Sequence, residues 1–469
     1  MFRDKSRFAL FFGNRGFFPS SLMKGAREEM PRILKELGHE TEIMAADATN
    51  HGAVETPEEG EKYARWLAER KDRVDGVILC LPNFGDETGA VAALKDAGMP
   101  IFVQAYPDEA DKMGPDSRRD SFCGKISILD VFHQYGVPCT FLKPHTVHPA
   151  SPRFKENIAV FDSICRVVGG IDGMILGGIG ARTTPFKTVR IDELALQRHG
   201  ITVETLDMSE VFARVRKMDD AAAAYKDKEK ILKDISNWDE VPEPNFKNLV
   251  KLAVVLDELS EEYNMDAMAL RCWTEMQTEL GVSPCVVMGV MNETGRPVAC
   301  ELDIGNAVAM YALELASAKP AGLLDWNNNY GDDDEKCILF HCGPMPPSMM
   351  VGKGNVTDHS IIANAVGQGC SFGCNTGRIQ PGDFTFSSLL TRDGKIHTYL
   401  GEGTFTEDTI PADFFGCAGV AYIPKLQDVL IHIGQEGHRH HVSVTSGRVS
   451  EALKEAYTNY LGFNVTMPQ

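Results

Sequence analysis

The sequence is poor in positive charge and has no long apolar run. Its 469 residues hold 47 Lys and Arg against 66 Asp and Glu, a formal net charge of −19. Nucleic acids and anionic membrane surfaces both bind clustered Lys and Arg, so we expect neither as a partner. No apolar run approaches the roughly 18 residues of a membrane span. Residues 1–13 lack the pattern of a signal peptide, and we therefore expect a cytoplasmic protein.

Several ligand motifs are also missing. None of the twelve cysteines forms a Cys-x-x-Cys pair, and only Cys370 and Cys374 lie close enough to suggest half of a zinc site. No Walker loop occurs. Gly178-Ile-Gly180 is similar to the start of a dinucleotide loop, but Thr183 stands at the third glycine position, so a simple turn between strand and helix is the favoured interpretation.

The first part of the chain alternates apolar strands with amphipathic helices. Residues 8–12, 74–81 and 100–104 are predicted strands, and residues 88–97 are a predicted helix. A further helix carries Met23, Met30 and Leu34 at helical spacing. Such alternation predicts a parallel sheet with helices on both faces.

The alternation restarts near residue 155, and the chain changes character after about residue 340. Strands are predicted at 171–176 and 201–206 around a glycine loop at 177–182, with helices at 191–199, 245–259 and 265–277. Farther on, Asp393-Gly394 separates two runs with strand character, 383–390 and 395–400, which predicts a hairpin. The sequence therefore predicts two α/β domains, 1–155 and 156–320, and a β-rich domain, 321–469.

Acidic and histidine side chains gather late in the sequence. Glu301 and Asp303 follow a predicted strand, where the sheets of α/β proteins place their ligand-binding groups. Asp325, His341 and the pair His440-His441 come later. Two carboxylates with two imidazoles suit a divalent metal ion, although each group could equally be an ordinary hydrogen-bonded side chain.

An ordered set of short motifs is spread from about residue 8 to 463. The motifs are Phe12-Gly-Asn-Arg-Gly-Phe-Phe-Pro19, Gly178-Ile-Gly-Ala-Arg182, Arg271-Cys-Trp273, Ala299-Cys-Glu-Leu-Asp303, Phe340-His-Cys-Gly343 and His440-His441. Together they resemble the L-fucose/L-arabinose isomerase family and most closely its shorter bacterial branch. The family fold has two Rossmann-like, doubly wound α/β domains followed by a β-rich C-terminal domain, and the resemblance implies the same fold here.

The resemblance also implies a divalent cofactor, usually Mn²⁺ with Mg²⁺ or Co²⁺ as alternatives. Glu301, Asp325 and His441 match the metal ligands, and the two acids match the catalytic groups. His341 matches a histidine that ligates or lines the site. We expect His341 and His440 to bind substrate. Arg15 either reaches substrate hydroxyls, across a subunit boundary in a homo-oligomer as the family suggests, or only stabilises its own loop.

Aldose–ketose isomerisation needs these residue types. A proton moves from C2 to C1 while the carbonyl shifts, a metal stabilises the ene-diolate, and a carboxylate takes and returns the proton. We therefore predict a metal-dependent isomerase of a small sugar. Two alternatives stay open: an isomerase of a modified hexose, sulfonated as in sulfoquinovose or phosphorylated, and a non-catalytic cytosolic sugar-binding protein.

Overall fold

The computed structural model describes residues 5–183 and 185–468, and the chain divides into two compact units. One unit comprises Arg3–Gly169 and Glu455–Gly462, and we call it the N-terminal unit. The other comprises the described residues of 170–454 and 463–468, and we call it the large unit. The division into three domains stays a prediction.

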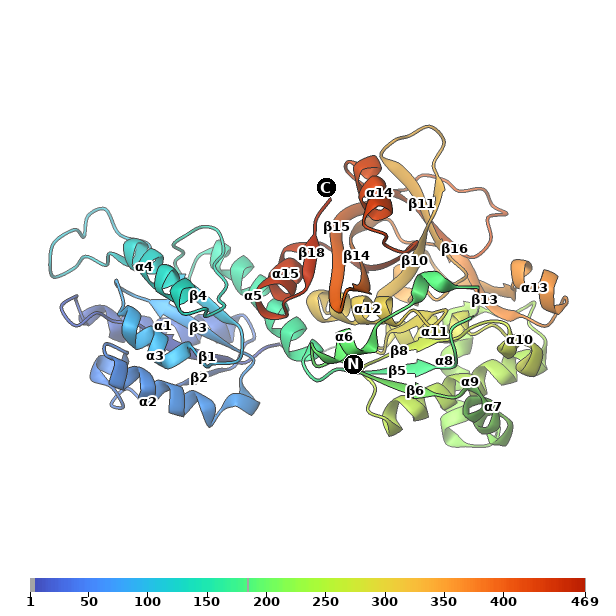
Figure 1. Cartoon of the computed structure of the whole chain (residues 1–469), viewed down its shortest axis with the longest axis horizontal. Helices are drawn as coiled ribbons and strands as arrows, with labels where there is room; N and C mark the ends of the chain where they lie inside the picture. The colour runs from blue at the N-terminus through green and yellow to red at the C-terminus, as the bar shows by residue number, and fades with distance from the viewer. Residues whose placement is uncertain (1–4, 184, 469) are drawn as a thin grey trace. The chain divides into compact units, whose positions relative to one another are not determined.

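The N-terminal unit is built on a four-stranded parallel sheet of order β2-β1-β3-β4, which confirms the predicted alternation (Figure 1). Its strands are β1 (Phe8–Phe12), β2 (Thr41–Ile43), β3 (Gly76–Leu81) and β4 (Ile101–Ala105). Its helices are α1 (Ser21–Glu36), α2 (Pro57–Ala68), α3 (Glu87–Leu94), α4 (Ser121–Gln134) and α5 (Pro152–Ile171), with 3₁₀ turns at Asn50–Gly52 and Lys71–Arg73.

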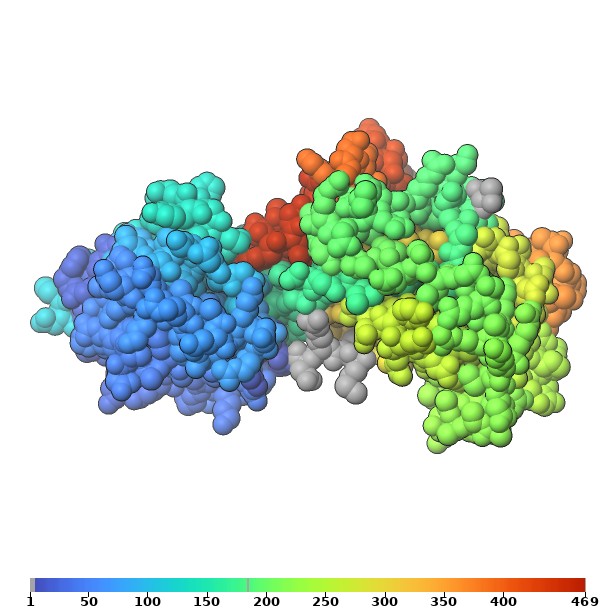
Figure 2. Space-filling view, turned by 60° about the horizontal axis from the view of Figure 1, so that its bottom comes forward, coloured from blue at the N-terminus to red at the C-terminus, as the bar shows by residue number. Residues whose placement is uncertain are grey.

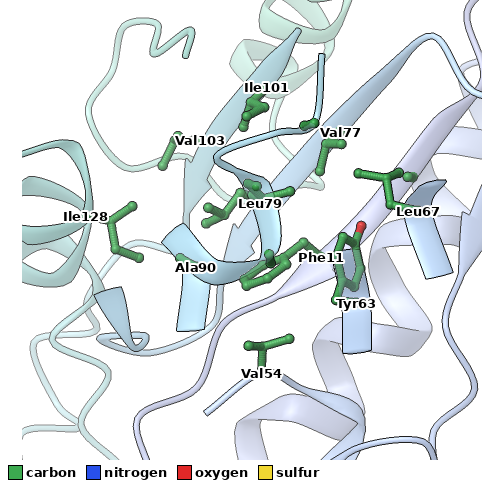
Figure 3. Packing of buried hydrophobic residues seen from close by; sticks show 14 of the residues in the cluster. Phe11, Val54, Tyr63, Leu67, Val77, Leu79, Ala90, Ile101, Val103 and Ile128 are labelled. Carbon is green, nitrogen blue, oxygen red and sulfur yellow. The ribbon is translucent and has the colours of Figure 1, made fainter. Parts of the chain in front are cut away.

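The strands of this sheet carry apolar side chains on both sides, and helices bury both faces. Figure 3 shows one face, where Phe11 packs beside Tyr63 of α2, with ring centroids 5.1 Å apart, and Leu79 belongs to the same cluster. On the opposite face Phe8 stacks on Phe161 of α5, with ring centroids 5.4 Å apart. Continuous apolar strands of this kind mark a sheet buried between two helix layers.

The large unit contains a second parallel sheet, of order β6-β5-β8-β9. Helices α7 (Met208–Lys217) and α8 (Ala223–Ile235) both pack against α9 (Glu243–Glu262), and their outer surface forms part of the green region of Figure 2. The strands are β5 (Ile175–Ile179), β6 (Thr202–Leu206), β8 (Ala267–Leu270) and β9 (Val298–Cys300). The helices are α6 (Glu193–Gln197), α7 (Met208–Lys217), α8 (Ala223–Ile235), α9 (Glu243–Glu262), α10 (Glu275–Leu280), α11 (Cys285–Glu293) and α12 (Ile304–Ser317), with a 3₁₀ turn at Lys187–Val189.

Two predictions in this region were wrong. The predicted helix 265–277 instead contains strand β8, a loop and only the first residues of α10. The short run Ala-Met-Ala-Leu is buried between β5 and β9, and this pairing overrides its helical propensity. The predicted strand 171–176 begins four residues later, and two glycines expected in the loop lie in β5. A Cβ on Gly177 would come within 2.2 Å of the Met265 sulfur, so the glycine permits close packing rather than a turn.

A ten-stranded, mostly antiparallel sheet forms the rest of the large unit, in the order β18-β15-β14-β17-β10-β11-β16-β13-β12-β7. Its β14–β15 hairpin turns at Asp393-Gly394 as predicted. The strands are β7 (Ser236–Asn237), β10 (Ala321–Asn329), β11 (Lys336–His341), β12 (Gly354–Asp358), β13 (Phe372–Arg378), β14 (Gly382–Arg392), β15 (Lys395–Phe405), β16 (Cys417–Tyr422), β17 (His441–Ser446) and β18 (Asn464–Thr466). The helices are α13 (Ser360–Val366), α14 (Leu426–Gln435) and α15 (Ser450–Glu455), with a 3₁₀ turn at Pro347–Met349. A π turn at Ala456–Tyr460 follows and belongs to the N-terminal unit.

Helix α12 joins the two sheets of the large unit. It packs against β8 and β9 of the parallel sheet and against β10, β14 and β17 of the large sheet, and nearly all of its residues are buried (Figure 1). The N-terminus of α12 and the end of β9 therefore lie beside the middle of the large sheet. Among the described residues, no helix is long and apolar enough to cross a membrane.

Candidate active site

Three neighbouring strands of the large sheet bring together residues that are far apart in the sequence. Asp325 of β10 pairs directly with His441 of β17, and Phe340, the neighbour of His341, pairs with Asp325 from the other side. Directly paired residues of antiparallel strands share a face of the sheet, so Asp325 and His441 point the same way. His341 is the last residue of β11 and directly follows Phe340, so it lies next to the Asp325–His441 pair.

Glu301 reaches the same place from the parallel sheet. It immediately follows β9, at the carboxyl end where ligand-binding groups of α/β sheets collect. Its φ of 59° and the φ of 59° at Leu302 lie in the left-handed region, which non-glycine residues adopt at a cost of order 1 kcal/mol or more each. Two such residues in succession are typical of functional sites.

The side chains converge at His441 Nε2. This atom lies 2.8 Å from Glu301 Oε2 and 3.6 Å from Asp325 Oδ1. Ligand atoms of Glu301, His341 and His441 all lie within 4.8 Å of one another, and so do those of Asp325, His440 and His441. The structure therefore brings together five of the six residues that the sequence pointed to.

The sixth, Arg15, belongs to the N-terminal unit. Its guanidinium donates to the carbonyl of Gly85 at 3.1 Å, pairs with Glu87 and lies 4.3 Å from the centre of the Phe84 ring. Arg15, which follows β1, is thus held by the loop between β3 and α3 of the same unit. Its expected role toward substrate stays a prediction.

Three further residues hold this cluster in position. The sequence placed Asp303 near the site, and both it and Trp273 in the family motifs, but assigned no catalytic or metal-binding role to them or to Arg439. Trp273 Nε1 donates to Glu301 Oε1 at 3.0 Å. Asp303 is fully buried, and its Oδ2 lies 2.8 Å from His441 Nδ1. Arg439, also buried, pairs with Asp303 Oδ1. The available signal was the spacing, since Asp303 comes two residues after Glu301 and Arg439 two residues before His441.

His341 and His441 use their ring nitrogens differently. The backbone N–H of Cys342 donates to His341 Nδ1 at 2.8 Å, so in the neutral ring the proton resides on Nε2. Burial lowers the pKa of His341 to about 4 and keeps this ring neutral. Its Nε2 is buried and makes no hydrogen bond to any described residue. His341 therefore presents an N–H donor to the site, whereas His441 presents Nε2 and uses Nδ1 toward Asp303.

The electrostatics of the cluster favour a cation. Burial lowers the pKa of His441, but the carboxylates of Asp303 and Glu301, each with an oxygen 2.8 Å from a ring nitrogen, outweigh burial and raise this pKa to about 10. Burial raises the pKa of Asp325 to about 7, since taking its charge out of water is costly. An ion that binds His441 Nε2 displaces the proton of this ring, and three carboxylates and the Arg439 guanidinium then leave two net negative charges, the complement of one divalent ion.

The donor atoms also fit such an ion. Asp325 Oδ1 and His441 Nε2 are buried, and neither makes a hydrogen bond within residues 5–183 and 185–468. Unsatisfied polar atoms are rare in protein interiors, and converging ones commonly await a ligand. Carboxylate oxygens with one imidazole nitrogen suit Mn²⁺, Mg²⁺ or Co²⁺. Glu301 groups with His341 and His441, and Asp325 groups with His440 and His441, so the ligand set Glu301, Asp325 and His441 stays a prediction.

A possible serine nucleophile does not compete with this site. The segment Gly369-Cys-Ser-Phe-Gly373 has the spacing of a nucleophile elbow, but it leads into strand β13 instead of a helix. Ser371 is fully buried, and its hydroxyl donates to Asp358 Oδ1 at 2.6 Å. The residue therefore stabilises its own turn.

Two family models match the chain in order. The model of the fucose/sulfoquinovose isomerase N-terminal domain covers residues 9–172, and that of the L-fucose isomerase C-terminal domain covers residues 339–468. The chain belongs to the L-fucose isomerase-like family. The predicted resemblance is thereby confirmed, and with it the conclusion that the chain is an aldose–ketose isomerase.

The family includes curated relatives that match most of this chain. A protein of Priestia aryabhattai named sulfoquinovose isomerase is 22% identical over 391 residues, which cover 82% of this chain and 83% of the relative. A sulfoquinovose isomerase of Alkalicoccus urumqiensis is 24% identical over 386 residues, covering 81% and 83%. These isomerases are similar to this chain along nearly its whole length.

Proposed function

We propose that this isomerase converts a sulfonated aldose, of the sulfoquinovose type, into the corresponding ketose with the help of a divalent ion. The names of the relatives support the sulfonated substrate. The observation that carries the metal is the buried cluster at His441 Nε2, in which unpaired donor atoms and two net negative charges meet. The isomerase of a modified hexose is thus favoured over an isomerase of an unmodified sugar.

In this proposal Glu301, Asp325 and His441 hold the ion, with Mn²⁺ the expected one. When bound, such an ion polarises the substrate carbonyl and stabilises negative charge on the substrate oxygens. The chain's own groups handle the proton. One of the two carboxylates takes the proton from C2 and returns it to C1, while the hydroxyl proton passes from O2 to O1.

The remaining groups orient the sugar. His341 Nε2–H donates to a substrate oxygen, because its other nitrogen already accepts from the Cys342 N–H. His440, half exposed beside Asp325, contacts the substrate at the mouth of the site. Phe186, whose ring centre lies 5.4 Å from that of His440 and 6.0 Å from that of Trp273, limits access of water. Arg15 of a neighbouring subunit completes the site in a homo-oligomer.

A sugar panel tests this function. Sulfoquinovose, D-glucose and L-fucose are each incubated with Mn²⁺ and the full chain in D₂O, and both ketose formation and deuterium uptake at C2 are measured. We expect turnover of sulfoquinovose and little of the neutral sugars. Preferred turnover of a neutral sugar would overturn the sulfonated substrate, and full activity after metal removal would overturn the ion.

A further inference from the structure

The fully buried carboxylate of Asp303 contacts His441 at Nδ1, the ring nitrogen opposite the one that faces Glu301 and Asp325. Its Oδ2 lies 2.8 Å from His441 Nδ1, and both side chains are fully buried. Since Asp303 is an ionised acceptor, the proton between them belongs to Nδ1. In the neutral ring that binds a cation, the lone pair is then on the opposite nitrogen, Nε2, which faces Glu301 and Asp325.

A network around Asp303 fixes that orientation. Oδ1 accepts from the backbone N–H of Asn306 at 3.1 Å and pairs with the Arg439 guanidinium, and Oδ2 also accepts from Asn306 Nδ2 at 2.7 Å. Arg439 in turn donates to the carbonyl of Arg190 at 3.2 Å. These partners all donate, so Asp303 must be a charged acceptor at both oxygens.

We infer that Asp303, anchored by Arg439, is a positioning residue that sets the tautomer of His441 and so makes Nε2 a metal ligand. This inference rests on the proposed metal-dependent function. It also separates His441 from His341, whose Nδ1 accepts a backbone N–H and whose Nε2 therefore carries a proton. Two neighbouring imidazoles thus take opposite tautomers, one suited to a cation and the other to a substrate oxygen.

Asp303→Asn distinguishes this role from a purely structural one. Asp303 also caps α12, but Asn caps a helix about as well as Asp. The Asn oxygen must stay at the Oδ1 position, where the Asn306 N–H and Arg439 donate. Its NH₂ group then faces His441 Nδ1, which must become an acceptor. The His441 proton moves to Nε2 and blocks the ion.

The experiment compares Mn²⁺ affinity in the full chain, measured by the EPR signal of free Mn²⁺. We expect Asp303→Asn to bind about 10- to 100-fold more weakly than wild type, the usual effect of losing a carboxylate behind a ligating histidine. The matched control is Asp207→Asn, because Asp207 caps α7 at the Ser209 N–H and lies outside this network. The control should bind as wild type does. Equal affinity in a folded Asp303→Asn protein would overturn the inference.

A spectroscopic measurement keeps the inference testable if the variant does not fold. Wild type labelled with ¹⁵N-histidine and loaded with Zn²⁺ is studied by solid-state NMR, with His441→Gln to assign the signal. We expect a protonated Nδ1 and a metal-bound Nε2 at His441. A metal-bound Nδ1, or a proton on Nε2, would overturn the inference. If wild type binds neither Mn²⁺ nor Zn²⁺, the proposed function fails instead.

Discussion

Asp325 and His441 face each other across the β10–β17 pairing, with Asp325 Oδ1 3.6 Å from His441 Nε2. Neither atom has a hydrogen-bond partner among the described residues. Glu301 approaches the same imidazole nitrogen from the end of β9, 2.8 Å away. The β10–β17 pairing and the carboxyl end of β9 therefore bring two carboxylates to one imidazole nitrogen, His441 Nε2.

Replacing Glu301 by Gln or Asp325 by Asn keeps the shape of each side chain and removes its charge. We expect each change to lower kcat by about 10²-fold or more, the scale of losing a general base or a metal ligand. Ketose formation at saturating Mn²⁺ measures the rate. If both variants turn over near the wild-type rate, the active site lies elsewhere.

His441 and His440 should differ in metal content. His441→Gln removes the buried nitrogen at which the two carboxylates meet, and we expect the purified variant to lose its bound ion. His440→Gln changes a half-exposed ring, 3.7 Å from Asp325 Oδ1, and should retain the ion with a raised KM. Metal analysis by mass spectrometry checks both variants, and the reverse ranking would exchange their roles.

Trp273→Phe removes a single hydrogen bond, the one from Nε1 to Glu301 Oε1. A hydrogen bond to a charged group contributes about 1.5–3 kcal/mol, so we expect a roughly 10- to 100-fold loss of kcat/KM. The ring's contact with Phe186 is largely kept by the phenyl group. Steady-state kinetics with Trp273→Phe alone are sufficient, and an unchanged kcat/KM would mean that Glu301 needs no such support.

Arg15 offers a test of subunit sharing. If the loop of a neighbouring subunit completes the site, inactive Arg15→Met and Glu301→Gln chains should regain some activity when refolded or coexpressed together. A mixed oligomer then contains one site with both intact residues. Mixed oligomers without activity argue against a shared site, and a fully active Arg15→Met protein leaves Arg15 its contacts with Gly85 and Glu87 alone.

Lys125 predicts a pH dependence of stability in the N-terminal unit. It lies buried on α4, donates from Nζ to the carbonyl of His145 at 2.8 Å, and burial lowers its pKa to about 8. An unfolded lysine has a pKa of about 10.4, so between these values the unfolded chain binds more protons and the contribution of Lys125 to stability rises with pH. Below about pH 8 both states are protonated and this contribution is constant.

The matched variant Lys125→Met has similar size and does not titrate. Urea unfolding at pH 7.5, 8.5 and 9.5, followed by circular dichroism, should show wild type gaining stability relative to Lys125→Met as pH rises. Titration of the buried thiols is common to both proteins and cancels in the difference. A difference that is constant over this range would contradict the lowered pKa.

The local sequence determined the elements that depend on local interactions. The turn at Asp393-Gly394 matches the β14–β15 hairpin because Gly394, at φ 71°, accepts the left-handed backbone that the turn needs. Parallel strands β1, β3 and β4 are continuous apolar runs, which only a sheet covered on both faces can bury. Motif order along the chain was likewise enough to indicate the family.

Tertiary structure decided the rest. Ala267–Leu270 has helical propensity, yet it is a strand because two parallel neighbours pair with it. Glu301 and His441 are 140 residues apart, and only the pairing of β17 with β10, together with the packing of α12 between two sheets, brings them within 2.8 Å. The role of Asp303 is of the same kind, because the partners of a buried carboxylate are set by long-range contacts that no local pattern records.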